Sequence, residues 1–115
     1  MGLSAMKTIM FNVISSSNSC YEVRFYRTSD KFISSCTCAA AEHGQLCKHR
    51  LEILHGDISS ITSGNEGEAV IVLSWLEGTT VAEALRQVSE AEAQCEIAKK
   101  NLSSAKKRLT RLLNE

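Results

Sequence analysis

Four residues in the first half of the chain have the types and spacing of a metal site. Cys36 and Cys38 flank one threonine, and after a gap of eight residues Cys47 and His49 flank one lysine. Each pair can hold an ion from one short piece of backbone, and the gap lets the two pairs close a tetrahedron. Three thiolates and one imidazole suit Zn²⁺, and four protein ligands leave no position for a substrate. The pattern therefore predicts one structural zinc ion per chain.

The remaining cysteines and a nearby histidine are weaker candidates for metal binding or catalysis. His43 lies between the two pairs and is an alternative ligand, although the pairs already fill the shell. Cys20 and Cys95 complete an odd set of five cysteines, which is less typical of a secreted disulfide scaffold. We expect both to be small buried hydrophobic residues. Neither has a histidine or acid at an activating spacing, so no enzyme is predicted.

Three predicted strands lead to the first ligand pair. Residues 7–14 are rich in β-branched and aromatic side chains. Residues 21–27 alternate between apolar and charged side chains, with Tyr21, Val23 and Phe25 on one face. Residues 31–36 form a returning strand that ends at Cys36, and polar turns separate the three.

A loop and a short helix are expected to carry the second ligand pair. Residues 39–46 are predicted to form the loop, with Gly44 supplying a positive φ angle. The apolar spacing over 46–55 predicts a short helix that stops at Gly56 and holds His49 in its first turn.

The second half of the chain is predicted to be mostly helical. Residues 57–67 are rich in serine, glycine and asparagine and indicate a connector. Residues 68–77 fit a strand by composition, but the stop at Gly78 favours a short helix. Thr80 and Glu83 form a capping box, and no proline or glycine interrupts the helical pattern from Val81 to Leu113.

The long helix carries a heptad seam, in which one of the two repeating positions is nearly always alanine. Acidic residues lie in its first half, and basic residues fill its second half. An antiparallel pair of such helices would place opposite charges side by side, and a parallel pair would place like charges together. The seam residues are Ala84, Val88, Ala91, Cys95, Ala98, Leu102, Ala105, Leu109 and Leu112.

The ligand spacing resembles the SWIM-type zinc finger, especially as small bacterial proteins carry it. The family signature, Cys-x-Cys followed by Cys-x-His, is matched by Cys36, Cys38, Cys47 and His49. The resemblance covers about residues 7–56 and implies a ββα arrangement around zinc, with binding to DNA or to other proteins. We therefore expect an α+β fold: a zinc-stabilised β-hairpin or sheet plus a short helix, then a long C-terminal helix with coiled-coil character. The expected domains are the finger (1–56), a connector with a short apolar element (57–78) and a helical arm (79–115).

Charge and composition limit the kinds of partner that the chain is expected to bind. Thirteen basic and thirteen acidic residues give no net charge, which disfavours binding to nucleic acid by charge alone. We expect a non-catalytic module that binds a protein partner or a second copy through residues 79–115, with no small-molecule substrate. The alternative is a DNA-binding accessory protein that uses Arg24, Lys48 and Arg50 beside the zinc and basic residues of the arm. No signal peptide or membrane span is recognisable, so a cytoplasmic location is expected.

Overall fold

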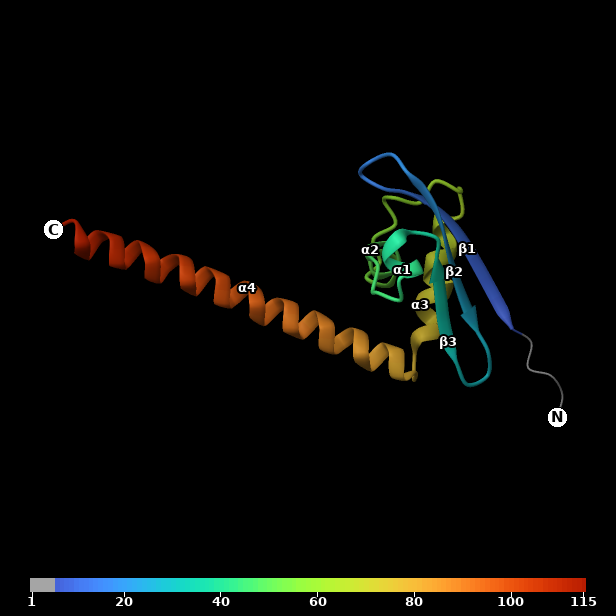
Figure 1. Cartoon of the computed structure of the whole chain (residues 1–115). Coiled ribbons are helices and arrows are strands. Elements are labelled where there is room, and N and C mark those ends of the chain that lie inside the picture. The colour runs from blue at the N-terminus through green and yellow to red at the C-terminus, as the bar shows by residue number, and fades with distance from the viewer. Residues whose placement is uncertain (1–5) are drawn as a thin grey trace. The chain divides into compact units, whose positions relative to one another are not determined.

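The computed structural model describes residues 6–115. The chain divides after Thr79 into two compact units (Figure 1), which we call the sheet unit and α4 (Thr80–Leu113). The predicted α+β class is confirmed: a small sheet with short helices is followed by one long helix. The elements of the sheet unit are β1 (Lys7–Ile14), β2 (Cys20–Arg27), β3 (Phe32–Cys36), α1 (Ala39–Glu42), α2 (Lys48–Leu54), the 3-10 turn η1 (Glu66–Glu68) and α3 (Ala69–Leu76).

The three strands form an antiparallel sheet in the order β1-β2-β3. The predicted strands are confirmed, with β2 starting one residue earlier and β3 one residue later than expected. Their alternation is also confirmed, because Val23 and Phe25 are buried and Glu22 and Arg24 are exposed. Val23 pairs with Phe11 on one side and with Cys36 on the other, so the register aligns the first ligand with the core face.

The core of the sheet unit is built on one face of the sheet. Phe25, on the central strand, packs edge-on against Phe11 at 6.1 Å and stacks on Phe32 at 5.9 Å, measured between ring centroids. Burying side chains of this size stabilises the fold by about 1.5–3 kcal/mol each. The largest fully buried side chains are Phe11, Phe25, Ile53, Val13, Val23, Val72 and Cys47.

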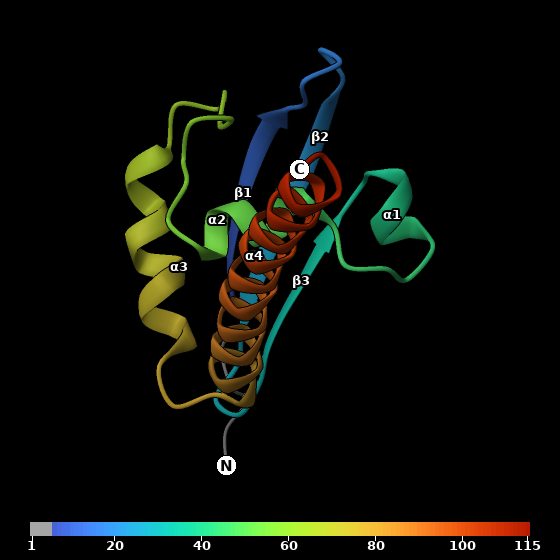
Figure 2. The same cartoon turned by 90° about the vertical axis from the view of Figure 1, so that its left-hand side faces the viewer.

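The helices α1, α2 and α3 all lie on this same face of the sheet (Figures 1 and 2). The loop expected over residues 39–46 is partly wrong, because Ala39–Glu42 form the short helix α1. Three consecutive alanines have high helix propensity and explain this turn. Gly44 (φ 74°) adopts the expected positive φ angle. Gly56 is the expected stop, because α2 ends just before it, and its φ of 89° is also positive.

Residues 57–78, expected to be a connector with a short apolar element, contribute the buried side chains of Ile61, Ala69, Val72 and Leu76 to the core of the sheet unit. Ile61 forms an isolated bridge with Val13 of β1. The Arg27 guanidinium donates from Nε to the carbonyl of Trp75 at 3.1 Å. The apolar element is the helix α3, as favoured from the sequence, and its buried residues are Ala69, Val72 and Leu76.

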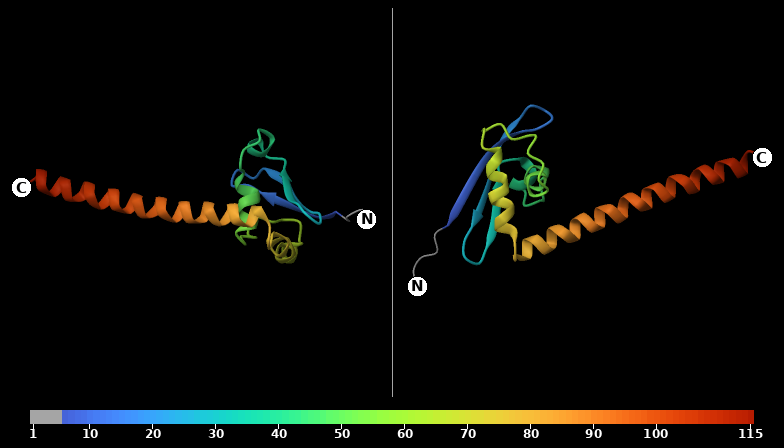
Figure 3. Two further views of the ribbon diagram at one scale, coloured as in Figure 1. Left: turned by 90° about the horizontal axis from the view of Figure 1, so that it is seen from below. Right: turned by 180° about the vertical axis from the view of Figure 1, so that it is seen from behind.

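The helix α4 is 34 residues long and continuous (Figure 3). It begins at Thr80, so this threonine lies in the first turn rather than at the expected cap position. No residue of α4 is buried, and every residue from Ala91 onward is exposed. Among the described residues, no helix has the length and apolar character needed to cross a membrane.

Candidate metal centre

The structure brings the four predicted ligands together in one buried cluster. Their ligand atoms all lie within 4.8 Å of one another. The side chains are almost inaccessible, with exposed fractions of 8% for Cys36, 5% for Cys38, 2% for Cys47 and 6% for His49. Three thiolates and one imidazole are a donor set that binds Zn²⁺ in structural sites. The cluster is therefore a Cys₃His group that can hold a metal ion.

Each ligand occupies the end of a regular element. Cys36 is the last residue of β3, and Cys38 is the N-cap of α1. Cys47 is the N-cap of α2, and His49 is the second residue of that helix. Because chain direction changes at element ends, short segments can turn their side chains toward a common point there.

A pair of hydrogen bonds anchors the first ligand pair to the central strand. The Thr37 amide donates to the Glu22 carbonyl at 3.1 Å, and the Glu22 amide donates to Thr37 Oγ1 at 3.0 Å. The residue between Cys36 and Cys38 is thus fixed to β2, which restricts where both thiols can point.

Arg50 is the residue that ties the second ligand pair to its surroundings. Its backbone amide lies 3.4 Å and its Nε 3.2 Å from Cys47 Sγ, and both donate to this sulfur. The other guanidinium nitrogens donate to the carbonyls of Ser34 at 3.4 Å and Gln45 at 3.1 Å. Arg50 therefore links α2, β3 and the loop before α2 around one ligand.

The thiols differ in acidity because their surroundings differ. Burial raises the pKa of Cys36 to about 12, so this thiol holds its proton when no cation is near. Burial also acts to raise the pKa of Cys47, but the backbone amide and guanidinium of Arg50 outweigh it and lower this pKa. The site thus contains one thiol prepared for ionisation by Arg50 and another that needs a cation to ionise.

The donor geometry fits a tetrahedral metal ion. Metal–sulfur bonds of about 2.3 Å place tetrahedral ligand atoms about 3.8 Å apart. His49 Nδ1 lies 3.9 Å from Cys36 Sγ, so this ring nitrogen is on the cluster side. The other ring nitrogen, Nε2, is buried and has no hydrogen-bond partner among the described residues. The imidazole ring packs against Tyr21, with centroids 4.9 Å apart.

The other candidate site residues lie outside the cluster. His43 is exposed and follows α1 as its C-cap. The expectation that Cys20 and Cys95 are buried is wrong, because both are exposed. Cys20 lies on the open face of the sheet, opposite the core, and Cys95 lies on a helix without buried residues, so neither is part of the core of the sheet unit.

The three basic residues considered for nucleic acid do not form one surface. Arg24 is exposed on the open face of the sheet and pairs with Glu22 at 3.1 Å. Lys48 is exposed at the start of α2. Arg50 is only partly exposed and is bonded within the metal centre, a role that the sequence reasoning missed. Its position three residues after an N-cap cysteine was the available signal.

Comparison with known proteins identifies no relative of this chain. No protein-family model matches the chain, and searches of curated proteins and of solved structures found no match.

Proposed function

We propose that the chain is a zinc-stabilised, non-catalytic interaction module. One structural Zn²⁺, held by Cys36, Cys38, Cys47 and His49, organises the sheet unit, and α4 is the surface that associates with a protein partner. The observation that carries the zinc proposal is the buried cluster of three thiols and one imidazole within 4.8 Å. Sulfur-rich tetrahedral sets favour zinc among the common cellular metals.

The resemblance to the SWIM-type finger supports the same proposal. The ligand order Cys-x-Cys then Cys-x-His is met by ligands at the end of a strand, before α1 and at the start of α2. A role in catalysis is disfavoured, because four protein ligands would complete the tetrahedral shell and leave no site for a reacting water.

The role of the ion would be to stabilise the fold. The sheet unit has about 80 residues, a size at which a hydrophobic core alone gives little stability. A metal that binds only the folded state contributes its binding free energy to folding. We expect the sheet unit to lose its tertiary structure when the ion is removed.

The test compares two cysteine substitutions in the full chain. Cys47→Ala removes a buried ligand, and Cys20→Ala removes an exposed cysteine outside the cluster. We expect zinc content to fall from one ion per chain to a small fraction in Cys47→Ala and to stay at one in Cys20→Ala. Near-ultraviolet circular dichroism should show loss of tertiary structure in the first variant alone. A folded Cys47→Ala protein with one zinc ion would overturn the proposal.

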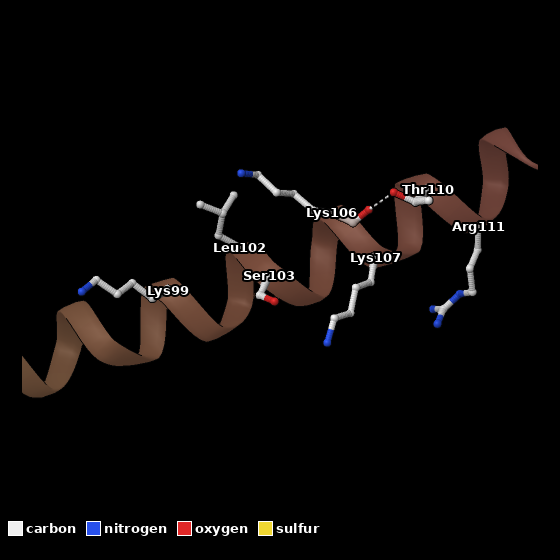
Figure 4. Close-up of a pocket in the computed structure, with 7 residues that line it drawn as sticks. All are labelled: Lys99, Leu102, Ser103, Lys106, Lys107, Thr110 and Arg111. Carbon is white, nitrogen blue, oxygen red and sulfur yellow. Dashed lines mark hydrogen bonds between the residues drawn. The ribbon is translucent and has the colours of Figure 1, made fainter.

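Binding to nucleic acid is the second candidate, favoured by the exposed basic half of α4. An open hollow along this helix is lined by Lys99, Leu102, Ser103, Lys106, Lys107, Thr110 and Arg111 (Figure 4). The salt dependence of binding to a nonspecific duplex tests it, because each neutralised phosphate steepens the slope. No binding at low salt would remove this candidate.

A further inference from the structure

The helix α4 presents an apolar stripe that no part of α4 covers. Leu102, Leu109 and Leu112 are 55%, 56% and 54% exposed. Most of the stability of helices in proteins comes from packing of an apolar face, and isolated helices are marginal in water. A 34-residue helix without a single buried residue therefore needs a partner along its length.

We propose that this partner is the α4 of a second copy of the chain, antiparallel and overlapping over the full length of the helix. This pairing rests on the proposed function, in which α4 is the association surface, and it identifies the partner as a second copy of the chain. In this pair Thr80 of one copy lies opposite Leu113 of the other, at the two ends of a helix about 50 Å long.

The sizes of the seam residues fit this alignment. With full antiparallel overlap, the large residue of almost every layer lies opposite an alanine, so the two backbones can approach closely along the helix. A parallel pair would instead place leucine opposite leucine and alanine opposite alanine, leaving gaps at the alanine layers. The antiparallel layers are Val81 with the partner's Leu112, Val88 with the partner's Ala105, Cys95 with the partner's Ala98, Leu102 with the partner's Ala91, and Leu109 with the partner's Ala84.

The charges beside the seam fit the same orientation. Glu92 and Lys99 occupy equivalent positions one heptad apart, on the edge of the stripe. Full antiparallel overlap places Glu92 beside the partner's Lys99, and the two-fold symmetry of the pair creates this contact twice. In a parallel pair Glu92 would lie beside the partner's Gln87, which offers no opposite charge.

The basic residues also select the register. Figure 4 shows Leu102 flanked along the helix by Lys99 and Lys106. The alternative register shifts the pair by one heptad, so that each residue meets a partner residue seven positions later in the sequence. Glu92 would then lie beside the partner's Lys106, but Lys99 would lie beside the partner's Lys99. Like charges at facing positions oppose association. Full overlap has no such pair. It is therefore the alignment in which the charges are complementary, large seam residues face alanines, and the helices overlap along their whole length.

Charge exchange in the full-length zinc-loaded protein tests the pairing. Glu92→Lys and Lys99→Glu each replace two attractive contacts by two repulsive ones, and we expect each to raise the dimer dissociation constant about tenfold. The double variant Glu92→Lys/Lys99→Glu should restore the wild-type constant. Lys100→Glu is the matched control, since it makes the same change one residue away on the outer face and should leave the constant near that of wild type.

A mixture of the two single variants gives the sharpest result. Each forms a homodimer with like charges, whereas the mixed dimer has two opposite-charge contacts. Native mass spectrometry of an equimolar mixture, with one variant labelled with ¹⁵N so that the three dimers differ in mass, should therefore show mostly the mixed dimer, at about twice the 12.6 kDa chain mass. A statistical mixture of dimers would overturn the antiparallel full-overlap pairing.

The same spectra separate failure of this inference from failure of the proposed function. Wild-type protein that is monomeric at micromolar concentration, with one zinc ion and a helical circular dichroism spectrum, would overturn the pairing and leave the zinc module standing. A dimer that contains no zinc would support the pairing and overturn the zinc module.

Discussion

Replacing Arg50 should weaken metal binding without removing a ligand. The Arg50 guanidinium donates from Nε to Cys47 Sγ at 3.2 Å and binds two carbonyls from neighbouring segments. A hydrogen bond to a charged group contributes about 1.5–3 kcal/mol, and partial exposure of Arg50 reduces this figure toward about 2 kcal/mol. Arg50→Gln should therefore raise the zinc dissociation constant about 30-fold. This falls within the range of about 10–100-fold typical of residues that orient metal ligands.

Competition with a chromophoric chelator would measure this constant for the full-length protein. Arg50→Lys should lie between Arg50→Gln and wild type, because lysine keeps the positive charge but lacks the planar fork that spans three acceptors. Arg24→Gln is the control, since Arg24 pairs with Glu22 on the opposite face of the sheet. An unchanged zinc constant in a folded Arg50→Gln protein would refute the reasoning that Arg50 supports the metal centre.

Three further perturbations test the fold and its dependence on the metal. Phe25→Ala, in the zinc-loaded protein, should lower the free energy of unfolding by about 3–5 kcal/mol, because Phe25 is fully buried between two aromatic rings; a denaturant titration showing less than about 1 kcal/mol would contradict the described core. Gly56→Ala should cost about 1 kcal/mol in the same titration, since its φ of 89° strains any side chain although no atom crowds the position; a stabilised variant would show that α2 does not end as described. Chelation should abolish the near-ultraviolet signal of the sheet unit, and readdition of zinc should restore it; a spectrum unchanged by chelation would mean that the metal does not hold this unit together.

The Cys₃His cluster could be predicted because its information is local in the sequence. Two Cys-x-Cys/His pairs separated by eight residues restrict the ligands to one small volume, whatever the rest of the chain does. The strands around them were predictable for a similar reason, since alternation in residues 21–27 reports directly which side chains face the core.

What the sequence did not reveal depends on contacts between distant segments. Residues 57–67 have the composition of a connector, yet Ile61 pairs with Val13, and the apolar element after them, α3, buries Val72. The exposure of Cys95 follows from a helix with no buried residues, which composition alone does not indicate. Arg50 has the charge of a nucleic-acid ligand, and only its contacts with Cys47 and two carbonyls reveal another use of that charge.

The most direct test of the central claim is native mass spectrometry of the purified full-length protein before and after chelation, with the metal identified by elemental analysis. The account predicts one zinc ion per chain, and a shift to highly charged, unfolded species when the ion is removed. A protein that carries no metal, or that keeps its compact charge distribution without one, would contradict the claim that Cys36, Cys38, Cys47 and His49 form a structural zinc site.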